Sequence, residues 1–170
     1  FLIFSISWSS DLLVVLPRSS NLVISSSSLT SSAIVAFIFK LIELKKIVDE
    51  KDGILSVAEQ NVQIPFEIKR VYHIYGLNDI SANRGYHAHK KLEQVIFCIN
   101  GSFKLITDDG KNKNNHILNN PNKGVYIGIN LWHTMSEFSQ DCIILVFASD
   151  FFNESDYIRN YNKFLKYIEE

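Results

Sequence analysis

Two histidines separated by one residue, His87 and His89, lie in the stretch RGYHAHKKLEQ, residues 84–94. Residues two apart in a β-strand point to the same face, so both imidazoles are expected to point together, with Ala88 on the opposite face. An imidazole is a base near neutral pH and also a ligand for divalent transition metals. The pair is therefore compatible with proton transfer, with metal binding, or with no chemistry at all.

A third histidine, His133, follows Trp132 in GVYIGINLWH. Three neutral imidazoles together with the Glu93 carboxylate would form a ligand set for a divalent transition metal. In a polar pocket, the same histidines would instead transfer protons near neutral pH. Lys90 and Lys91 lie beside the pair, and their positive charge is unfavourable for a metal and favours an anionic substrate. The spacing alone leaves both chemistries open.

Closely spaced turn signals predict an antiparallel β architecture around these residues. Asn100–Gly101 has the composition of a tight hairpin turn, in which both central residues take positive φ, and apolar residues flank it on both sides. Asp109–Gly110 and Asp52–Gly53 mark two further turns. VIFCI and CIILVF are apolar at successive positions, so both faces of those strands should be covered. Without a βαβ alternation or a glycine-rich phosphate loop, this pattern favours a sandwich or barrel over a nucleotide-binding α/β fold.

A helix is predicted only near the C-terminus, in ESDYIRNYNKFLKYIEE. Apolar and aromatic residues recur there at intervals of three or four, as in an amphipathic helix. These residues are Tyr157, Tyr161, Phe164 and Ile168. The helix is expected to pack against the barrel.

The chain divides near residue 39. Residues 1–39 are rich in serine and aliphatic residues without a sustained period of 2 or 3.6, and residues 19–39 carry no charge. That stretch is long enough to span a bilayer, but its serine cluster lowers its insertion propensity, and it is a poor match to a secretory signal. We therefore predict an extension outside the fold at residues 1–39, no membrane anchor, and one folded domain over residues 40–170.

The net charge and the cysteine content bear on the partners and the cellular location of the protein. The formal net charge of −1 gives no electrostatic case for a nucleic acid partner. Cys98 and Cys142 each lie in an apolar run and are expected to be buried, reduced thiols. Such thiols are compatible with a cytoplasmic location, which is the one we expect.

The histidine spacing resembles the cupin family, in which an HxH pair is followed by Glu or Gln and by a glycine that closes a hairpin. The corresponding residues here are His87, His89, Glu93 or Gln94, and Gly101. GVYIGINLWH resembles the second cupin motif, with His133 as its histidine, although Gly128 and Asn130 replace the usual Pro and Gly.

A longer resemblance covers about 130 residues, from about Lys40 to the C-terminus. The stretches IPFEIKRVYHIYG, RGYHAHKKLEQVIFCINGSFKLITDDG, GVYIGINLWH and ASDFFNESDYIRNYNKFLKYI are similar to the sugar 3,4-ketoisomerases that act on dTDP-4-keto-6-deoxyglucose. This resemblance implies an all-β, cupin-like jelly-roll barrel with a short C-terminal helix, and a homodimer that needs no metal or other cofactor. It also implies an isomerase that moves a keto group from C4 to C3 through an enediolate, within deoxyamino-sugar biosynthesis.

By the same resemblance, His89 is the expected base and His87 its acid or orienting partner. Arg84 is expected to hold charge on the oxyanion or the diphosphate, and Tyr75 to donate through its phenol. The predicted substrate-binding residues are Arg84, Lys90, Gln94, Trp132 and His133. Residues 41–44 and 54–57 are expected to pair across subunits. Two rivals are a metal-dependent cupin that uses His87, His89, Glu93 and His133, and a non-catalytic carbohydrate-binding cupin.

Overall fold

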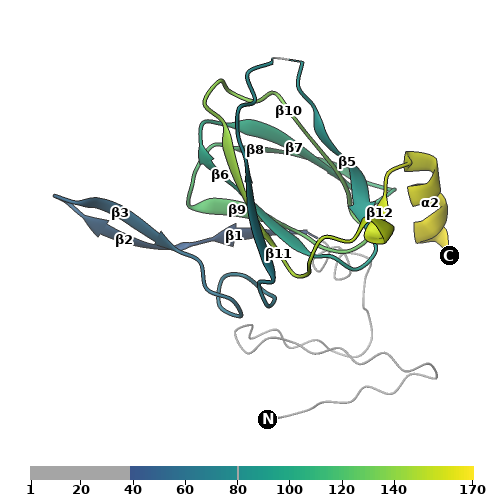
Figure 1. Cartoon of the computed structure of the whole chain (residues 1–170), viewed down its shortest axis with the longest axis horizontal. Coiled ribbons are helices and arrows are strands. Elements are labelled where there is room, and N and C mark those ends of the chain that lie inside the picture. Colours follow the sequence, from purple (N-terminus) through teal and green to yellow (C-terminus); the bar gives the residue numbers. More distant parts are fainter. Residues whose placement is uncertain (1–38, 80) are drawn as a thin grey trace, which may run out of the picture. The chain divides into compact units, whose positions relative to one another are not determined.

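The computed structural model describes residues 39–79 and 81–170, most of which form two five-stranded antiparallel sheets (Figure 1). In spatial order, the first sheet contains β1 (Phe39–Glu43), β9 (Lys123–Ile127), β6 (Gln94–Asn100), β11 (Ile143–Ala148) and β4 (Arg70–Ile74). The second contains β12 (Tyr157–Ile158), β5 (Arg84–His89), β10 (Trp132–Ser136), β7 (Phe103–Asp108) and β8 (Lys113–Leu118). The chain alternates between the sheets from β4 to β7, and the predicted cupin-like jelly roll is confirmed.

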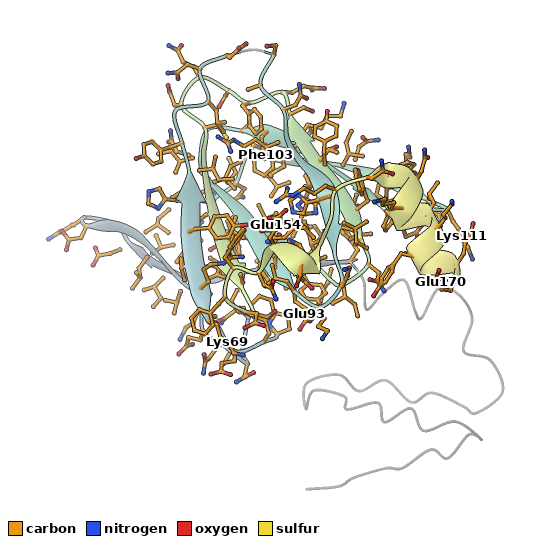
Figure 2. The ribbon with its side chains drawn as sticks, turned by 45° about the vertical axis from the view of Figure 1, so that its right-hand side comes forward. Lys69, Glu93, Phe103, Lys111, Glu154 and Glu170 are labelled. Atoms are coloured by element: carbon orange, nitrogen blue, oxygen red, sulfur yellow. The ribbon has the colours of Figure 1, made fainter. Side chains whose placement is uncertain are left out.

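The main core lies between the two sheets. Ile96 and Val146 from the first sheet belong to the same buried cluster as Leu105 and Met135 from the second. Figure 2 shows the side chains that fill this space, Phe103 among them. Burial of these apolar surfaces holds the sheets face to face and positions the strands that carry the histidines.

Strand β6 is covered on both faces, as its unbroken apolar sequence predicts. Five successive residues from its start, Gln94 to Cys98, are buried. Ile96 and Cys98 face the main core, whereas Val95 and Phe97 pack on the other side against Ile64 and other residues of a second cluster. The irregular segment before β4, which contains Ile64, therefore covers the outer face of β6.

Two of the three predicted turns join paired strands, and the third does not. Asp109–Gly110 connects the paired strands β7 and β8, and Asp52–Gly53 connects β2 (Lys45–Asp49) to β3 (Gly53–Val57). The Asn100–Gly101 hairpin prediction is wrong, because β6 and β7 lie in opposite sheets and only Gly101 takes positive φ, at 71°. A Cβ at Gly101 would lie 3.1 Å from the backbone of Cys142, so this turn passes too close to a neighbouring loop for a larger residue.

Strands β2 and β3 pair only with each other and form a hairpin that projects from the sheets (Figure 1). Its apolar side chains are exposed on both of its faces. The exposed fractions are 46% for Ile47, 62% for Val48, 61% for Ile54 and 58% for Leu55. In the part of the chain that the structure describes, nothing covers this hairpin.

The predicted C-terminal helix is shorter than its sequence pattern suggests. Only α2 (Tyr161–Glu169) is α-helical, and it begins after Asn160, whose side chain accepts a hydrogen bond from the Lys163 amide at 3.0 Å. The residues before it form the 3₁₀ turn η1 (Glu154–Asp156) and the short strand β12. Pairing of β12 with β5 therefore overrides the helical periodicity at Tyr157.

The expected extension at residues 1–39 lies outside the described residues, except that Phe39 already belongs to β1. Among the described residues, no helix is both long enough and apolar enough to cross a membrane. Cys98 and Cys142 are buried and free, as predicted.

Candidate active site

A cavity of about 370 Å³ opens between the two sheets. Its volume lies within the range of small-ligand sites. Polar side chains reach it from five strands: Tyr72 (β4), Arg84 and His87 (β5), Gln94 (β6), His133 (β10) and Tyr157 (β12). The structure therefore brings His87, His133, Gln94 and Arg84 together, as the sequence predicted.

An irregular start of β5 aims His87 into this cavity. Gly85 and Tyr86 both take positive φ, at 83° and 56°, and the pairing of β5 with β10 shifts register at His133. A Cβ at Gly85 would lie only 2.7 Å from the carbonyl oxygen of His133, so glycine is required for this close approach. The bulge places His87 directly opposite His133, with ring centroids 4.4 Å apart.

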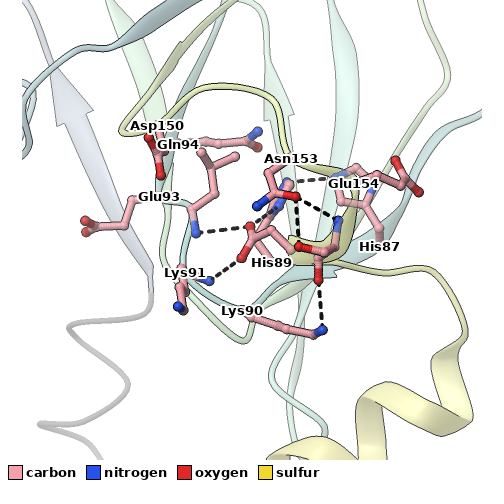
Figure 3. A network of polar contacts seen from close by, with 12 residues as sticks. His87, His89, Lys90, Lys91, Glu93, Gln94, Asp150, Asn153 and Glu154 are labelled. Atoms are coloured by element: carbon pink, nitrogen blue, oxygen red, sulfur yellow. Dashed lines mark hydrogen bonds and ion pairs between the residues drawn. The ribbon is translucent and has the colours of Figure 1, made fainter.

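Close polar contacts link His87 to His89 (Figure 3) and His89 to Asp156. Nδ1 of His87 lies 2.9 Å from the carbonyl oxygen of Gly85, and Nε2 of His87 lies 3.2 Å from Nε2 of His89. Nδ1 of His89 lies 2.9 Å from a carboxylate oxygen of Asp156. His89 is 2% exposed and does not line the cavity, so it lies behind His87 rather than beside it.

Burial lowers the pKa of each of the three histidines. For His87, loss of hydration lowers the pKa, and the hydrogen bond to Gly85 partly opposes this effect. For His89, burial and then the neighbouring His87 lower the pKa, whereas the Asp156 carboxylate raises it. The pKa of His133 is also well below its usual value because of burial. The imidazoles are therefore uncharged near neutral pH and able to accept a proton.

Tyr72, which is partly buried, and Gln94, which is buried, form a polar pair on the wall opposite the histidines. The amide nitrogen of Gln94 donates to the phenol oxygen of Tyr72 at 3.1 Å, which leaves the Tyr72 hydroxyl proton free to donate elsewhere. Burial raises the pKa of Tyr72 to about 12, so the phenol keeps its proton near neutral pH. The Gln94 Oε1 atom is buried without a hydrogen-bond partner in the part of the chain that the structure describes. The pair therefore offers both a donor and an acceptor to oxygen atoms of a ligand.

Arg159 is a second cationic residue, in addition to Arg84, that lines the cavity. Arg159 follows β12, and its guanidinium lies 4.3 Å from the ring centre of Tyr157. It also donates to both carboxylate oxygens of Glu154, at 2.7 and 2.9 Å. Two exposed arginine heads at one cavity can bind an anion such as a phosphate.

Three predicted site residues lie away from the cavity. Tyr75 follows β4 and is 67% exposed, because Tyr72 and Ile74 are the residues of this strand that point inward. Trp132 packs against Tyr161 and Phe164, since neighbouring residues of β10 point to opposite faces and His133 takes the inner one. The Lys90 ammonium donates to the backbone carbonyl of Ser155 at 2.9 Å.

Glu93 is not near the histidines, contrary to the expectation of the metal-binding rival. It precedes Gln94 and points away from His87 and His89 (Figure 3), where its carboxylate accepts a hydrogen bond from the Tyr126 hydroxyl. Across residues 39–79 and 81–170, no three His, Cys, Asp or Glu side chains are grouped in a way that could hold a metal ion. The predicted four-residue ligand set is therefore not assembled.

Sequence reasoning missed four residues of the site. These are Tyr72, Asp156, Tyr157 and Arg159. The alternation of RVYHI could have identified Tyr72, given the inward direction of the strand. Asp156, Tyr157 and Arg159 were hidden by a helical pattern that the structure does not follow.

The fold and the cavity define the class of this protein: a cupin-like jelly roll with acid–base side chains between its sheets. The chain belongs to the family described as "FdtA: WxcM-like, C-terminal", which matches residues 38–169. It is 48% identical over 129 residues to a TDP-4-oxo-6-deoxy-alpha-D-glucose-3,4-oxoisomerase from Aneurinibacillus thermoaerophilus, with coverage of 76% of this chain and 91% of that protein. The resemblance predicted from the sequence is confirmed.

Solved structures of 3,4-ketoisomerases share the fold and much of the sequence. One from Helicobacter canadensis is 43% identical with a TM-score of 0.74, covering 78% of this chain and 98% of its own. A sugar 3,4-ketoisomerase from Thermoanaerobacterium thermosaccharolyticum in complex with TDP is 42% identical with a TM-score of 0.75, covering 78% and 96%. A TDP-quinovose 3,4-ketoisomerase from Campylobacter jejuni is 47% identical with a TM-score of 0.71, covering 75% and 97%.

Proposed function

We propose that this chain is an isomerase that moves the keto group of a dTDP-linked 4-keto-6-deoxyhexose from C4 to C3. The observation that carries the proposal is a cavity in which the neutral imidazole of His87 faces a protonated phenol, Tyr72, across the space between the sheets. Isomerisation of a hydroxy ketone needs these two groups, a base for the carbon-bound proton and a donor for the oxygen. The names of the similar enzymes support the same reaction.

The reaction moves one carbon-bound proton and one oxygen-bound proton. Nε2 of His87 takes the proton from C3, and the electrons of the broken C–H bond form the C3–C4 double bond while the C4 carbonyl electrons move to O4. The hydroxyl proton then passes from O3 to O4, and the proton on His87 is delivered to C4. The product carries a ketone at C3 and a hydroxyl at C4, so atoms and electrons balance without a cofactor.

The geometry favours His87 over His89 as the base. His87 lines the cavity, and its Nδ1 is occupied by the carbonyl of Gly85, so Nε2 is its available nitrogen. His89 lies behind it and contacts His87 through Nε2. We therefore assign His89 the partner role, which reverses the roles expected from the sequence.

Tyr72, Gln94 and His133 are placed to bind the oxygens at C3 and C4. The enediolate oxygen gains negative charge in the transition state, and a fixed phenol in a dry cavity stabilises it more in that state than in the ground state. Gln94 Oε1 and Nδ1 of His133 are both buried without a hydrogen-bond partner among the described residues. A bound sugar would provide partners for both atoms.

Arg84 and Arg159 are the proposed ligands of the diphosphate. Both line the cavity and both have exposed heads, so their charge is available at its mouth. Guanidinium groups match phosphate oxygens in geometry as well as charge. Arg159 would exchange its bond to Glu154 for bonds to the ligand.

We also propose that the chain forms a homodimer in the cytoplasm through the β2–β3 hairpin. A hairpin with apolar side chains on both faces is only marginally stable by itself in water, and burial against a partner surface would stabilise it. A second copy would supply equivalent strands. In light scattering, the wild type is expected to have the mass of a dimer, and the double variant Ile54→Asp/Leu55→Asp that of a monomer. Equal monomer masses for both proteins would exclude this interface.

Incubation with dTDP-4-keto-6-deoxyglucose followed by NMR of the product tests the reaction directly. The expected product carries its ketone at C3, and the same spectrum defines the configuration at C4. Binding of the nucleotide sugar without conversion would favour the carbohydrate-binding rival. Conversion that depends on an added divalent ion would favour the metal-dependent rival.

A further inference from the structure

We propose that Asp156 is a positioning residue that fixes the tautomer of His89, so that Nε2 of His89 and Nε2 of His87 face each other without a proton and share the one that the reaction releases. The role of this pair in turnover rests on the proposed function. Its resting arrangement follows from the hydrogen bonds that the two Nδ1 atoms make.

The tautomer of His87 is fixed by a group that can only accept. A backbone carbonyl has no proton, so Nδ1 of His87 must carry the proton of its 2.9 Å bond to Gly85. In the neutral ring, Nε2 of His87 then holds a lone pair. Nε2 of His89 lies 3.2 Å from this nitrogen.

The tautomer of His89 is fixed by Asp156 in the same way. Both Asp156 oxygens already accept backbone hydrogen bonds, from the Lys91 amide at 2.8 Å and from the Leu92 amide at 3.2 Å. The carboxylate therefore acts as an acceptor toward Nδ1 of His89 at 2.9 Å, and Nδ1 carries the proton. In the neutral ring, Nε2 of His89 is also left with a lone pair.

Two lone pairs at this separation repel each other until one proton lies between them. Proton transfer from C3 of the sugar to His87 would convert the contact into an N–H···N hydrogen bond and place a positive charge within reach of the Asp156 carboxylate. The pair would then hold the proton beside the cavity until C4 receives it.

Several other charged or titratable groups surround this pair, and burial opposes its protonation. They are His133 of β10, Tyr157 of β12, Arg70 and Tyr72 of β4, Glu154 of η1, and Arg159 after β12. Arg70 and Arg159 disfavour a charged imidazole, whereas Glu154 favours it. Asp156 is the carboxylate in direct contact, so it makes the largest favourable charge contribution to the protonated pair.

Asp156→Asn tests the proposal because it changes the hydrogen-bonding character but little of the shape. With its nitrogen in the place of Oδ2, the asparagine amide would donate to Nδ1 of His89 and shift the ring proton to Nε2, with loss of the hydrogen bond from the Leu92 amide. In the full-length wild type without substrate, ¹⁵N NMR of the imidazoles is expected to show protonated Nδ1 on both His87 and His89. In Asp156→Asn, His89 is expected to show a protonated Nε2. Protonated Nε2 on His89 in the wild type would overturn the proposal.

The pH profile provides a second measurement that a purely structural role would not change. A carboxylate raises the pKa of the imidazoles it faces, so its removal lowers their pKa. Because the neutral pair is the active form, the acidic limb of kcat/KM is expected to move to lower pH by about 1–3 units. At the optimum, kcat is expected to fall by at least about tenfold, as part of the about 10²–10⁴-fold contribution of a general base. An acidic limb that stays in place would overturn the proposal.

Asn153→Ala is the matched control. Its side chain caps η1 through the Ser155 amide at 3.0 Å and does not touch the histidines. This variant is expected to loosen η1 in the same way as Asp156→Asn. The acidic limb of its kcat/KM profile and the tautomers of its imidazoles are expected to stay unchanged. An equal displacement of the limb in both variants would mean that Asp156 acts only by holding η1. If the wild type has the expected tautomers but does not convert the nucleotide sugar, the proposed function fails and the arrangement of the pair stands.

Discussion

Replacement of His87 or His89 by asparagine separates the base from its partner. His87→Asn removes the nitrogen that faces the cavity, while the shorter amide can still donate toward the carbonyl of Gly85. The loss of a general base is worth about 10²–10⁴-fold in turnover, or about 3–5 kcal/mol of activation free energy. Nucleotide binding is expected to change little, because Arg84 and Arg159 are untouched.

His89→Asn is expected to have a smaller effect on turnover than His87→Asn. The His87 imidazole remains in the cavity, but it loses the partner that shares its proton. The asparagine amide takes the place of Nδ1 and can still donate to Asp156, so the hydrogen bonds of this largely buried carboxylate are kept and Tm is expected to change little.

The assay is exchange of the C3 proton in deuterated water, followed by NMR in parallel with turnover. The wild type is expected to incorporate deuterium at C3 or C4, and His87→Asn to abolish this exchange. His89→Asn should retain measurable exchange. If His87→Asn exchanges at a rate near that of the wild type while His89→Asn does not, His89 is the base and the assignment from the cavity is wrong.

Four further outcomes are expected. Tyr72→Phe should lower kcat by about 10²–10³-fold with little change in KM, because the lost donor acts on the enediolate oxygen; an unchanged kcat in steady-state kinetics would assign that role elsewhere. Arg84→Ala should raise KM as well as lower kcat, because the anionic substrate loses a partner; an unchanged KM would remove Arg84 from the binding site. Turnover should survive exhaustive chelation; a loss that one divalent ion restores would support the metal-dependent rival. Deletion of residues 1–38 should leave folding and turnover intact, because the family match begins at residue 38 and β1 at Phe39; an insoluble or inactive product would show that the segment is needed.

The sequence predicted the fold better than the pairing of its strands. Turn composition and apolar runs define where strands begin and end, and they correctly indicated a two-layered β architecture. They do not show that the chain crosses to the opposite sheet after Asn100, where β6 ends. This crossing depends on the packing of Gly101 against a loop about 40 residues later in the chain. Local sequence patterns thus predict where the strands lie in the chain, whereas tertiary contacts determine which strands pair with each other.

The site was predicted where its residues lie on regular strands and missed where they come from segments outside the predicted strands. His87 and the opposing His133 follow from period-two alternation and motif spacing. Tyr75 was misplaced because the inward face of β4 is set by burial and not by its local sequence. Asp156 and Tyr157 lie in a segment whose apolar spacing suits a helix, and only the pairing of β12 with β5 reveals their role.

The contact between His89 and Asp156 joins residues 67 positions apart, and one of them lies close to the C-terminus. During synthesis on the ribosome, the barrel strands up to β11 emerge before this carboxylate does. A nascent chain that stops before β12 would therefore contain the strands up to β11 but lack the carboxylate that contacts His89. Residues 156–170 thus contribute to the arrangement of the histidine pair as well as to the packing of α2.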